Sequence, residues 1–101
     1  MLRRTTLIQG PAGPSATVQG SPTPWTPGTL TNGSFVALDV TVTGALVGNG
    51  AFAGWDSLLP DGVTLTAQVK SADLVRCLMM NQSGTSQTIT AGHVYAEALN
   101  P

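Results

Sequence analysis

Apolar and polar residues alternate from Ser34 onward with the period of two that is typical of half-buried β-strands. The alternation is clearest over residues 36–42 and 63–69. It predicts that six side chains point into one core: Val36, Leu38, Val40, Val63, Leu65 and Val69. Further strands are predicted over residues 51–55, 74–81, 87–90 and 93–99. Short strands at this spacing, with no helical period anywhere, predict an all-β sandwich or barrel.

Turn signals separate the predicted strands. Pro60-Asp61-Gly62 combines residues that favour a tight turn. The short connection at residues 71–73 predicts the clearest hairpin of the chain, and Asn81-Gln82-Ser83-Gly84 predicts the turn after it. Near the hairpin end, Asp73 is expected to pair with Lys70 or Arg76, with little energetic weight because solvent screens such pairs.

Residues 1–33 differ from the rest, because they contain five of the seven prolines and only one short predicted strand, Ala16 to Gln19. A stretch of this length without regular structure is uncommon inside a compact domain and is often a binding arm. We therefore expect an extended N-terminal arm over residues 1–33 and a β-sandwich domain over residues 34–101. The expected anchors of the arm on neighbouring subunits are its apolar side chains: Leu7, Ile8, Val18, Trp25 and Leu30.

Charged residues make up only 9% of the chain, against roughly 25% in typical soluble domains. A surface with so few charges is expected to be covered in part by other protein, although a neutral secreted β domain coated with Thr and Ser is an alternative. With four basic residues and a net charge of −1, the chain offers no basic patch for nucleic acid. Pro and Gly interrupt the longest uncharged stretch, residues 5–38, so no membrane span is expected there. The first residues also lack the apolar run of a signal peptide, which predicts synthesis in the cytoplasm.

The candidate reactive residues do not form a recognisable catalytic motif, so we expect no enzyme, metal or cofactor. Cys77 is the single cysteine and lies in an apolar run, which predicts a buried structural thiol. His93 is the single histidine, and a triad would need a nearby serine and a buried aspartate. One histidine and one cysteine are too few for a zinc site, and the acidic residues are too scattered for a calcium loop.

Two aromatic residues, Trp55 and Tyr95, are candidates for stacking on a sugar ring or for packing in a subunit interface. In the alternative to sugar binding, the tryptophans have packing roles: Trp25 anchors the arm, and Trp55 packs in the sandwich or in a subunit interface.

Four segments between Asp39 and Leu99 carry a resemblance to a β domain found repeatedly in virion proteins of tailed bacteriophages. They are Val40-Thr41-Val42-Thr43-Gly44-Ala45, Leu59-Pro60-Asp61-Gly62-Val63-Thr64-Leu65-Thr66-Ala67-Gln68-Val69, Ser71-Ala72-Asp73-Leu74-Val75 and Asn81-Gln82-Ser83-Gly84. The resemblance implies a jelly-roll-like antiparallel β-sandwich in a trimeric virion component, either a capsid cement (decoration) protein or the tip of a fibre. The chain departs from this pattern at Ala51-Phe52-Ala53-Gly54-Trp55 and at Leu78-Met79-Met80, and these departures indicate surface that packs against something.

The leading hypothesis is a homotrimeric cement protein that binds the major capsid protein on the outside of the shell. Two collagen-like triplets, residues 10–15, are either an extended turn or a trace of three-chain association. The alternative is a fibre or tail-tip module that recognises host-surface carbohydrate through the region of Trp55 or Tyr95. That alternative is expected to need a shaft or attachment domain beyond 101 residues. A secreted sugar-binding domain, the third hypothesis, is expected to need a signal peptide.

Overall fold

The computed structural model describes residues 16–100, with side chains from 17 to 99, and all regular structure in this part is β-strand. The strands in chain order are β1 (Ala16–Gln19), β2 (Thr23–Trp25), β3 (Gly28–Leu30), β4 (Phe35–Thr41), β5 (Gly50–Trp55), β6 (Val63–Ser71), β7 (Leu74–Asn81), β8 (Gln87–Ile89) and β9 (Gly92–Asn100). All pairings between them are antiparallel. The prediction of an all-β fold is confirmed.

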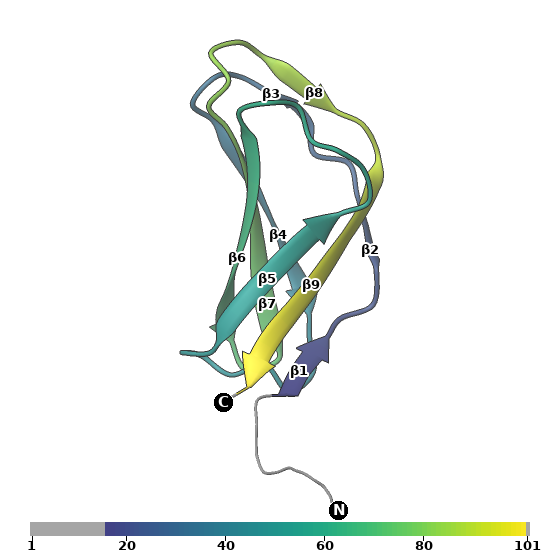
Figure 1. Cartoon of the computed structure of the whole chain (residues 1–101), viewed down its shortest axis with the longest axis vertical. Helices are drawn as coiled ribbons and strands as arrows, with labels where there is room; N and C mark the ends of the chain where they lie inside the picture. The colour runs from purple at the N-terminus through teal and green to yellow at the C-terminus, as the bar shows by residue number, and fades with distance from the viewer. Residues whose placement is uncertain (1–15, 101) are drawn as a thin grey trace, which may run out of the picture.

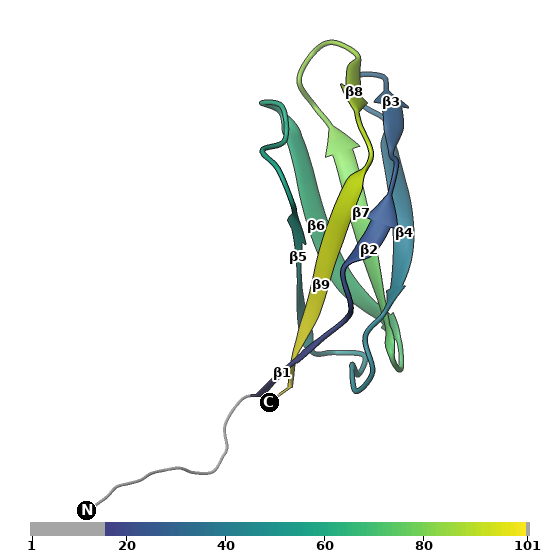
Figure 2. The same cartoon turned by 90° about the vertical axis from the view of Figure 1, so that its right-hand side faces the viewer.

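Two sheets lie face to face along the length of the domain (Figures 1 and 2). In the first, called the β9 sheet, β9 pairs with β5 on one side and with β1 and β2 on the other. In the second, called the β7 sheet, β7 lies between β4 and β6. The short pair β3–β8 lies at one end of the molecule and β1 at the other (Figure 1).

β1 and β2 follow one another along the same edge of β9, as a single strand broken at residues 20–22. Pro22 lacks an amide hydrogen for the ladder, which favours a break there. Gly20 keeps contact by donating its backbone N–H to the carbonyl of Ala96 at 2.9 Å. A Cβ on Gly20 would lie only 2.7 Å from the backbone oxygen of Thr41, so a residue without a side chain brings this edge close to the β7 sheet.

The hairpin of β6 and β7 confirms the strongest local prediction. Its turn places Asp73 at φ 66°, a left-handed conformation that aspartate tolerates better than most residues. The Asp73 carboxylate accepts a hydrogen bond from the backbone N–H of Gly44 at 2.7 Å. The expected ion pair of Asp73 with Lys70 or Arg76 is therefore wrong, because both basic side chains bind Asp39 instead.

The core lies between the two sheets and confirms the predicted inward face. Val40, Val63 and Val69 are buried, and the other three predicted core residues are partly buried and pack against them: Val36, Leu38 and Leu65. Central positions come from the middle strands, where Val75, Cys77 and Met79 of β7 and Val94 of β9 are fully buried. Cys77 is a buried thiol, as predicted.

Asn81 is the one buried polar side chain in the described residues, and it connects the end of β3 with the loop between β7 and β8. Its Nδ2 donates to the carbonyls of Leu30 at 2.7 Å and Thr85 at 2.8 Å, while its Oδ1 accepts from the backbone N–H of Ser83 at 2.9 Å. The amide is thus hydrogen-bonded at both ends, as burial requires. In the Asn-x-Ser-Gly turn of the sequence, the side chain of Asn81 therefore holds the loop between β7 and β8 against the end of β3 by hydrogen bonds.

The predicted boundary at residue 33 is wrong for residues 16–30, which belong to the sandwich. β1 forms where it was predicted, and β2 and β3 extend the domain further. Trp25 and Leu30 are only 9% and 4% exposed, and Val18 packs against the core, so these three residues are not free anchors of an arm. The prolines concealed the strand pattern: Pro24 lies in β2 at an edge of the sheet, where a missing amide hydrogen is tolerated. Leu7, Ile8 and the triplets at residues 10–15 lie outside the described residues.

The jelly-roll arrangement remains a prediction. A complete jelly roll has two Greek keys in eight strands. The described strands instead group as sheets of four, three and two.

Candidate interaction surfaces

The outward side of the β9 sheet, called the β9 face, exposes two aromatic rings. Phe52 is 55% and Tyr95 is 46% exposed. In the register of β5 and β9, Tyr95 lies opposite Gly54, and Phe52 lies opposite Glu97. Because Gly54 has no side chain, the Tyr95 ring is left uncovered on that side, and it lies diagonally across from Phe52.

Trp55 and Tyr95, the two predicted site residues, lie on opposite sides of the β9 sheet. Tyr95 is next to Val94, the cross-strand partner of Trp55, and successive residues of a strand point to opposite faces. The Trp55 ring meets the Trp25 ring edge to face, with centroids 6.1 Å apart and planes at 80°. Trp55 therefore packs inside the sandwich, as the packing alternative predicted, and the two residues do not form one platform.

The outward side of the β7 sheet, called the β7 face, is apolar at one end and charged in the middle. Phe35 is 60% exposed, and its row across the sheet continues with Met80, which is partly buried. The next row contains Leu78, also partly buried. These apolar residues lie toward the β3–β8 end. The charged row lies two residues from Leu78, on the side away from that end.

The charged row consists of one carboxylate between two cations. Asp39 lies 2.8 Å from the Nζ of Lys70 and 3.1 Å from the Nε of Arg76. The hydrogen bonds from Lys70 and then Arg76 lower the pKa of Asp39 below its ordinary value. One negative and two positive charges leave this row with a net charge of +1.

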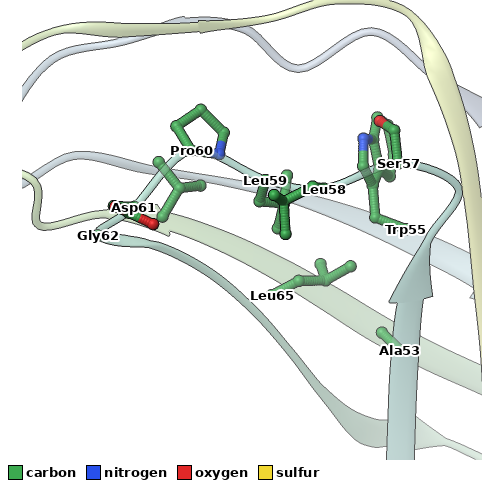
Figure 3. Close-up of a pocket in the computed structure, with 10 residues that line it drawn as sticks. Ala53, Trp55, Ser57, Leu58, Leu59, Pro60, Asp61, Gly62 and Leu65 are labelled. Carbon is green, nitrogen blue, oxygen red and sulfur yellow. The ribbon is translucent and has the colours of Figure 1, made fainter.

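A shallow groove of about 430 Å³ lies where the loop from Trp55 to Gly62 crosses from β5 to β6 (Figure 3). Most of the residues that line it have apolar side chains, although polar atoms make up the larger part of its surface, and Leu58 on the same loop is 96% exposed. Small-molecule sites usually enclose most of their ligand and place several polar groups around it. This groove is widely open and has one ionisable residue, Asp61, so it lacks the features of a small-molecule site.

The Asp56 carboxylate and the His93 ring form the only aspartate–histidine pair in the described part of the chain. The Asp56 Oδ2 lies 3.1 Å from both the backbone nitrogen and the Nδ1 of His93. No serine hydroxyl is bonded to this histidine within residues 16–100, so a third member of a triad is not in place.

Burial, followed by the charge of Asp39, raises the pKa of the Cys77 thiol to about 11, which keeps it protonated at neutral pH.

Within residues 16–100, no group of three or more His, Cys, Asp or Glu side chains is placed to hold a metal ion. No helix long and apolar enough to span a membrane occurs among the same residues. No protein-family model, no curated protein and no solved structure matches this chain.

Sequence reasoning missed most residues of the two faces as individual candidates. Phe52, Leu78 and Met80 lie in the two segments that depart from the phage pattern, but only the segments, not the residues, were singled out. Glu97 was missed altogether. The sequence could have identified it by its spacing, because Glu97 is two residues after Tyr95. In a strand these two side chains point to the same face, so an outward Tyr95 implies an outward Glu97.

Proposed function

We propose that this chain is a structural virion protein of a tailed bacteriophage, most specifically a capsid cement protein. In this proposal it is made in the host cytoplasm, associates as a homotrimer with a jelly-roll-like sandwich, and binds the major capsid protein on the outer shell. It works by binding alone, without catalysis, metal or cofactor. The observation that carries the proposal is the exposure of apolar side chains on both outer faces of the sandwich, in a chain that has only 9% charged residues.

Exposed apolar side chains argue for assembly when they gather on one surface. Single exposed apolar residues are normal, but contiguous patches mark contact sites. Phe35 with Met80 and Leu78 forms one such group, and Phe52 with Tyr95 forms the other. The chain as a whole carries few charges, so a free domain has little protection against association.

The arm is retained in the proposal over residues 1–15, with Leu7 and Ile8 as its anchors. An extended segment of 15 residues spans at most about 50 Å, which is long enough to reach a neighbouring subunit. One trimer would carry three arms, and linked weak contacts bind more tightly than separate ones because later contacts become intramolecular. Val18, Trp25 and Leu30 contribute to folding instead.

The test compares purified particles that lack the protein with particles to which it has been added back. Decorated particles should open at a higher temperature, because a ligand that binds only the assembled shell stabilises it. The variant Leu7→Ser/Ile8→Ser should keep the urea midpoint of the domain and bind particles at least about tenfold more weakly. Thr5→Ser/Thr6→Ser is the matched control and should bind normally. Equal opening temperatures for bare and decorated particles would contradict the cement function.

A second candidate function is a fibre or tail-tip module that binds host-surface carbohydrate. The observation that favours it is the Tyr95 ring, exposed beside Phe52 above Gly54, because aromatic faces stack on sugar rings. Binding of host polysaccharide that is lost in Tyr95→Ala, together with no binding to heads, would favour this function over the first.

A further inference from the structure

The β9 face carries an acidic residue between two apolar ones. Along β9, Tyr95, Glu97 and Leu99 all point outward, because the residues between them are buried. Glu97 forms no ion pair or hydrogen bond with any residue from 16 to 100. Its carboxylate is therefore available to pair with a cation from outside the domain, as charges do across complementary interfaces.

The β7 face carries the complementary sequence of side chains. Along β7, Leu74, Arg76 and Leu78 all point outward. Lys70 of β6 joins Arg76 on the same face, and together with Asp39 they give this row its net charge of +1. Each face therefore has a charged residue between two apolar ones along its central strand, with successive outward residues about 6.8 Å apart. The central charge is negative on β9 and positive on β7.

The direction of the two strands fixes how the faces can meet. β7 runs toward the β3–β8 end, whereas β9 starts there and runs toward β1 (Figures 1 and 2). On β7 the larger apolar patch, Leu78 with Met80, lies nearer the β3–β8 end than Arg76. On β9 the aromatic residue Tyr95 also lies nearer that end than Glu97. Two copies that point the same way can therefore pair aromatic with aliphatic side chains and Glu97 with Arg76.

We propose that the β9 face of one copy binds the β7 face of the next copy, with both copies pointing in the same direction. In this contact Glu97 pairs with Arg76 and Lys70 of the neighbouring copy, Tyr95 packs on its Leu78, and Phe52, which lies in the same row as Glu97, covers the ion pair from the side. Because the contact joins two different faces on opposite sides of the sandwich, it is heterologous: it closes into a ring where successive copies are rotated by equal fractions of a full turn, and otherwise it continues as an open stack. The inference rests on the self-association part of the proposed function and does not depend on capsid binding.

Charge and apolar variants of the full chain test the contact in sedimentation experiments. Glu97→Lys and Phe52→Ser should each raise the dissociation constant of the oligomer at least about tenfold, with the urea midpoint unchanged. Asp61→Lys and Leu58→Ser are the matched controls, since they make the same changes at exposed positions outside both faces, and they should associate normally. Combining Glu97→Lys with Arg76→Glu should restore association, because the pair is reversed rather than removed.

Disulfide crosslinking tests the direction of the contact and counts the copies. The Tyr95→Cys/Leu78→Cys protein should crosslink between copies into a ladder, which ends at the number of subunits if the contact closes into a ring and continues if the copies form an open stack. The Tyr95→Cys/Leu74→Cys protein should not crosslink, because its two thiols would meet only if neighbouring copies pointed in opposite directions. Cys77 does not compete, since it is buried.

Three outcomes would overturn the inference: a monomer at all micromolar concentrations, equal effects of Glu97→Lys and Asp61→Lys, or crosslinking of Tyr95→Cys with Leu74→Cys. The proposed function fails separately. A ring that forms through these faces but does not bind or stabilise heads would refute the cement function and leave the inference intact. Conversely, a trimer that stabilises heads but is unaffected by Glu97→Lys and by Phe52→Ser would support the cement function and refute the contact between the β9 and β7 faces.

Discussion

Replacing Asn81 with alanine should destabilise the domain more than any other polar-to-alanine change in its described part. Asn81→Ala removes three hydrogen bonds of 2.7, 2.8 and 2.9 Å at a side chain that is 0% exposed. At a net value of roughly 0.5–1.5 kcal/mol for each bond, the loss amounts to about 1.5–4.5 kcal/mol. For a domain of this size, at roughly 4–8 °C per kcal/mol, that corresponds to a fall in Tm of at least about 6 °C.

Urea unfolding followed by tryptophan fluorescence measures this loss, because Trp25 and Trp55 pack against each other in the core. The matched control is Asn32→Ala. Asn32 also reaches the β7–β8 turn, where its Oδ1 accepts from the backbone N–H of Gly84 at 3.0 Å, but this bond is exposed. Its loss should cost about 0.5 kcal/mol or less.

A second replacement at the same position separates hydrogen bonding from packing. Asn81→Asp keeps the size of the side chain but replaces its donor by a carboxylate oxygen that faces the carbonyls of Leu30 and Thr85. It should be less stable than Asn81→Ala at pH 7 and should recover as the pH falls, because the protonated acid can donate again. If Asn81→Ala lowers the free energy of unfolding no more than Asn32→Ala does, the hydrogen bonds of Asn81 do not hold this end of the domain together.

Three further predictions concern the thiol, the ion pair and a glycine. Cys77 should not react with iodoacetamide at pH 8 unless the protein unfolds, because burial raises its pKa to about 11; rapid labelling of the native protein would contradict this. The pKa of Asp39 is lowered in the folded state, so its pairs contribute stability above about pH 4 that is lost as the pH falls through the folded pKa. Asp39→Asn should therefore flatten the acid side of the stability–pH curve, by a small amount because the pairs are exposed. Gly92→Ala would place a Cβ 2.6 Å from the Trp55 ring and should cost about 1–3 kcal/mol with a change in tryptophan fluorescence.

The strands after residue 33 could be predicted because their alternation is undisturbed. β7 has the predicted bounds, and the predicted core side chains of β4 and β6 face inward. These strands each have one buried face, so the period of two is written directly into their sequence. β2 and β3 could not be found in this way, because each has three residues and prolines lie within or beside them.

The surfaces were less predictable, because a face depends on the pairing of strands far apart in the chain. Alternation alone places Tyr95 and Glu97 on one side of β9, but only the register with β5 brings Phe52 beside them. Asp39 illustrates the same limit. Its ion pairs with Lys70 and Arg76 join three strands, and the sequence instead favoured Asp73, the acid that is nearest along the chain.

The corrected boundary decides which truncation can test the arm. A deletion of residues 1–33 would also remove β1, β2 and β3, and with them the buried side chains of Trp25 and Leu30. Losing a buried tryptophan alone typically costs about 3–5 kcal/mol, a large part of the stability of a small domain. Weak capsid binding by such a protein would reflect unfolding as much as a missing arm. Deletion of residues 1–15 leaves every strand that the structure describes in place, so any loss of binding that it causes, at an unchanged urea midpoint, belongs to the arm itself.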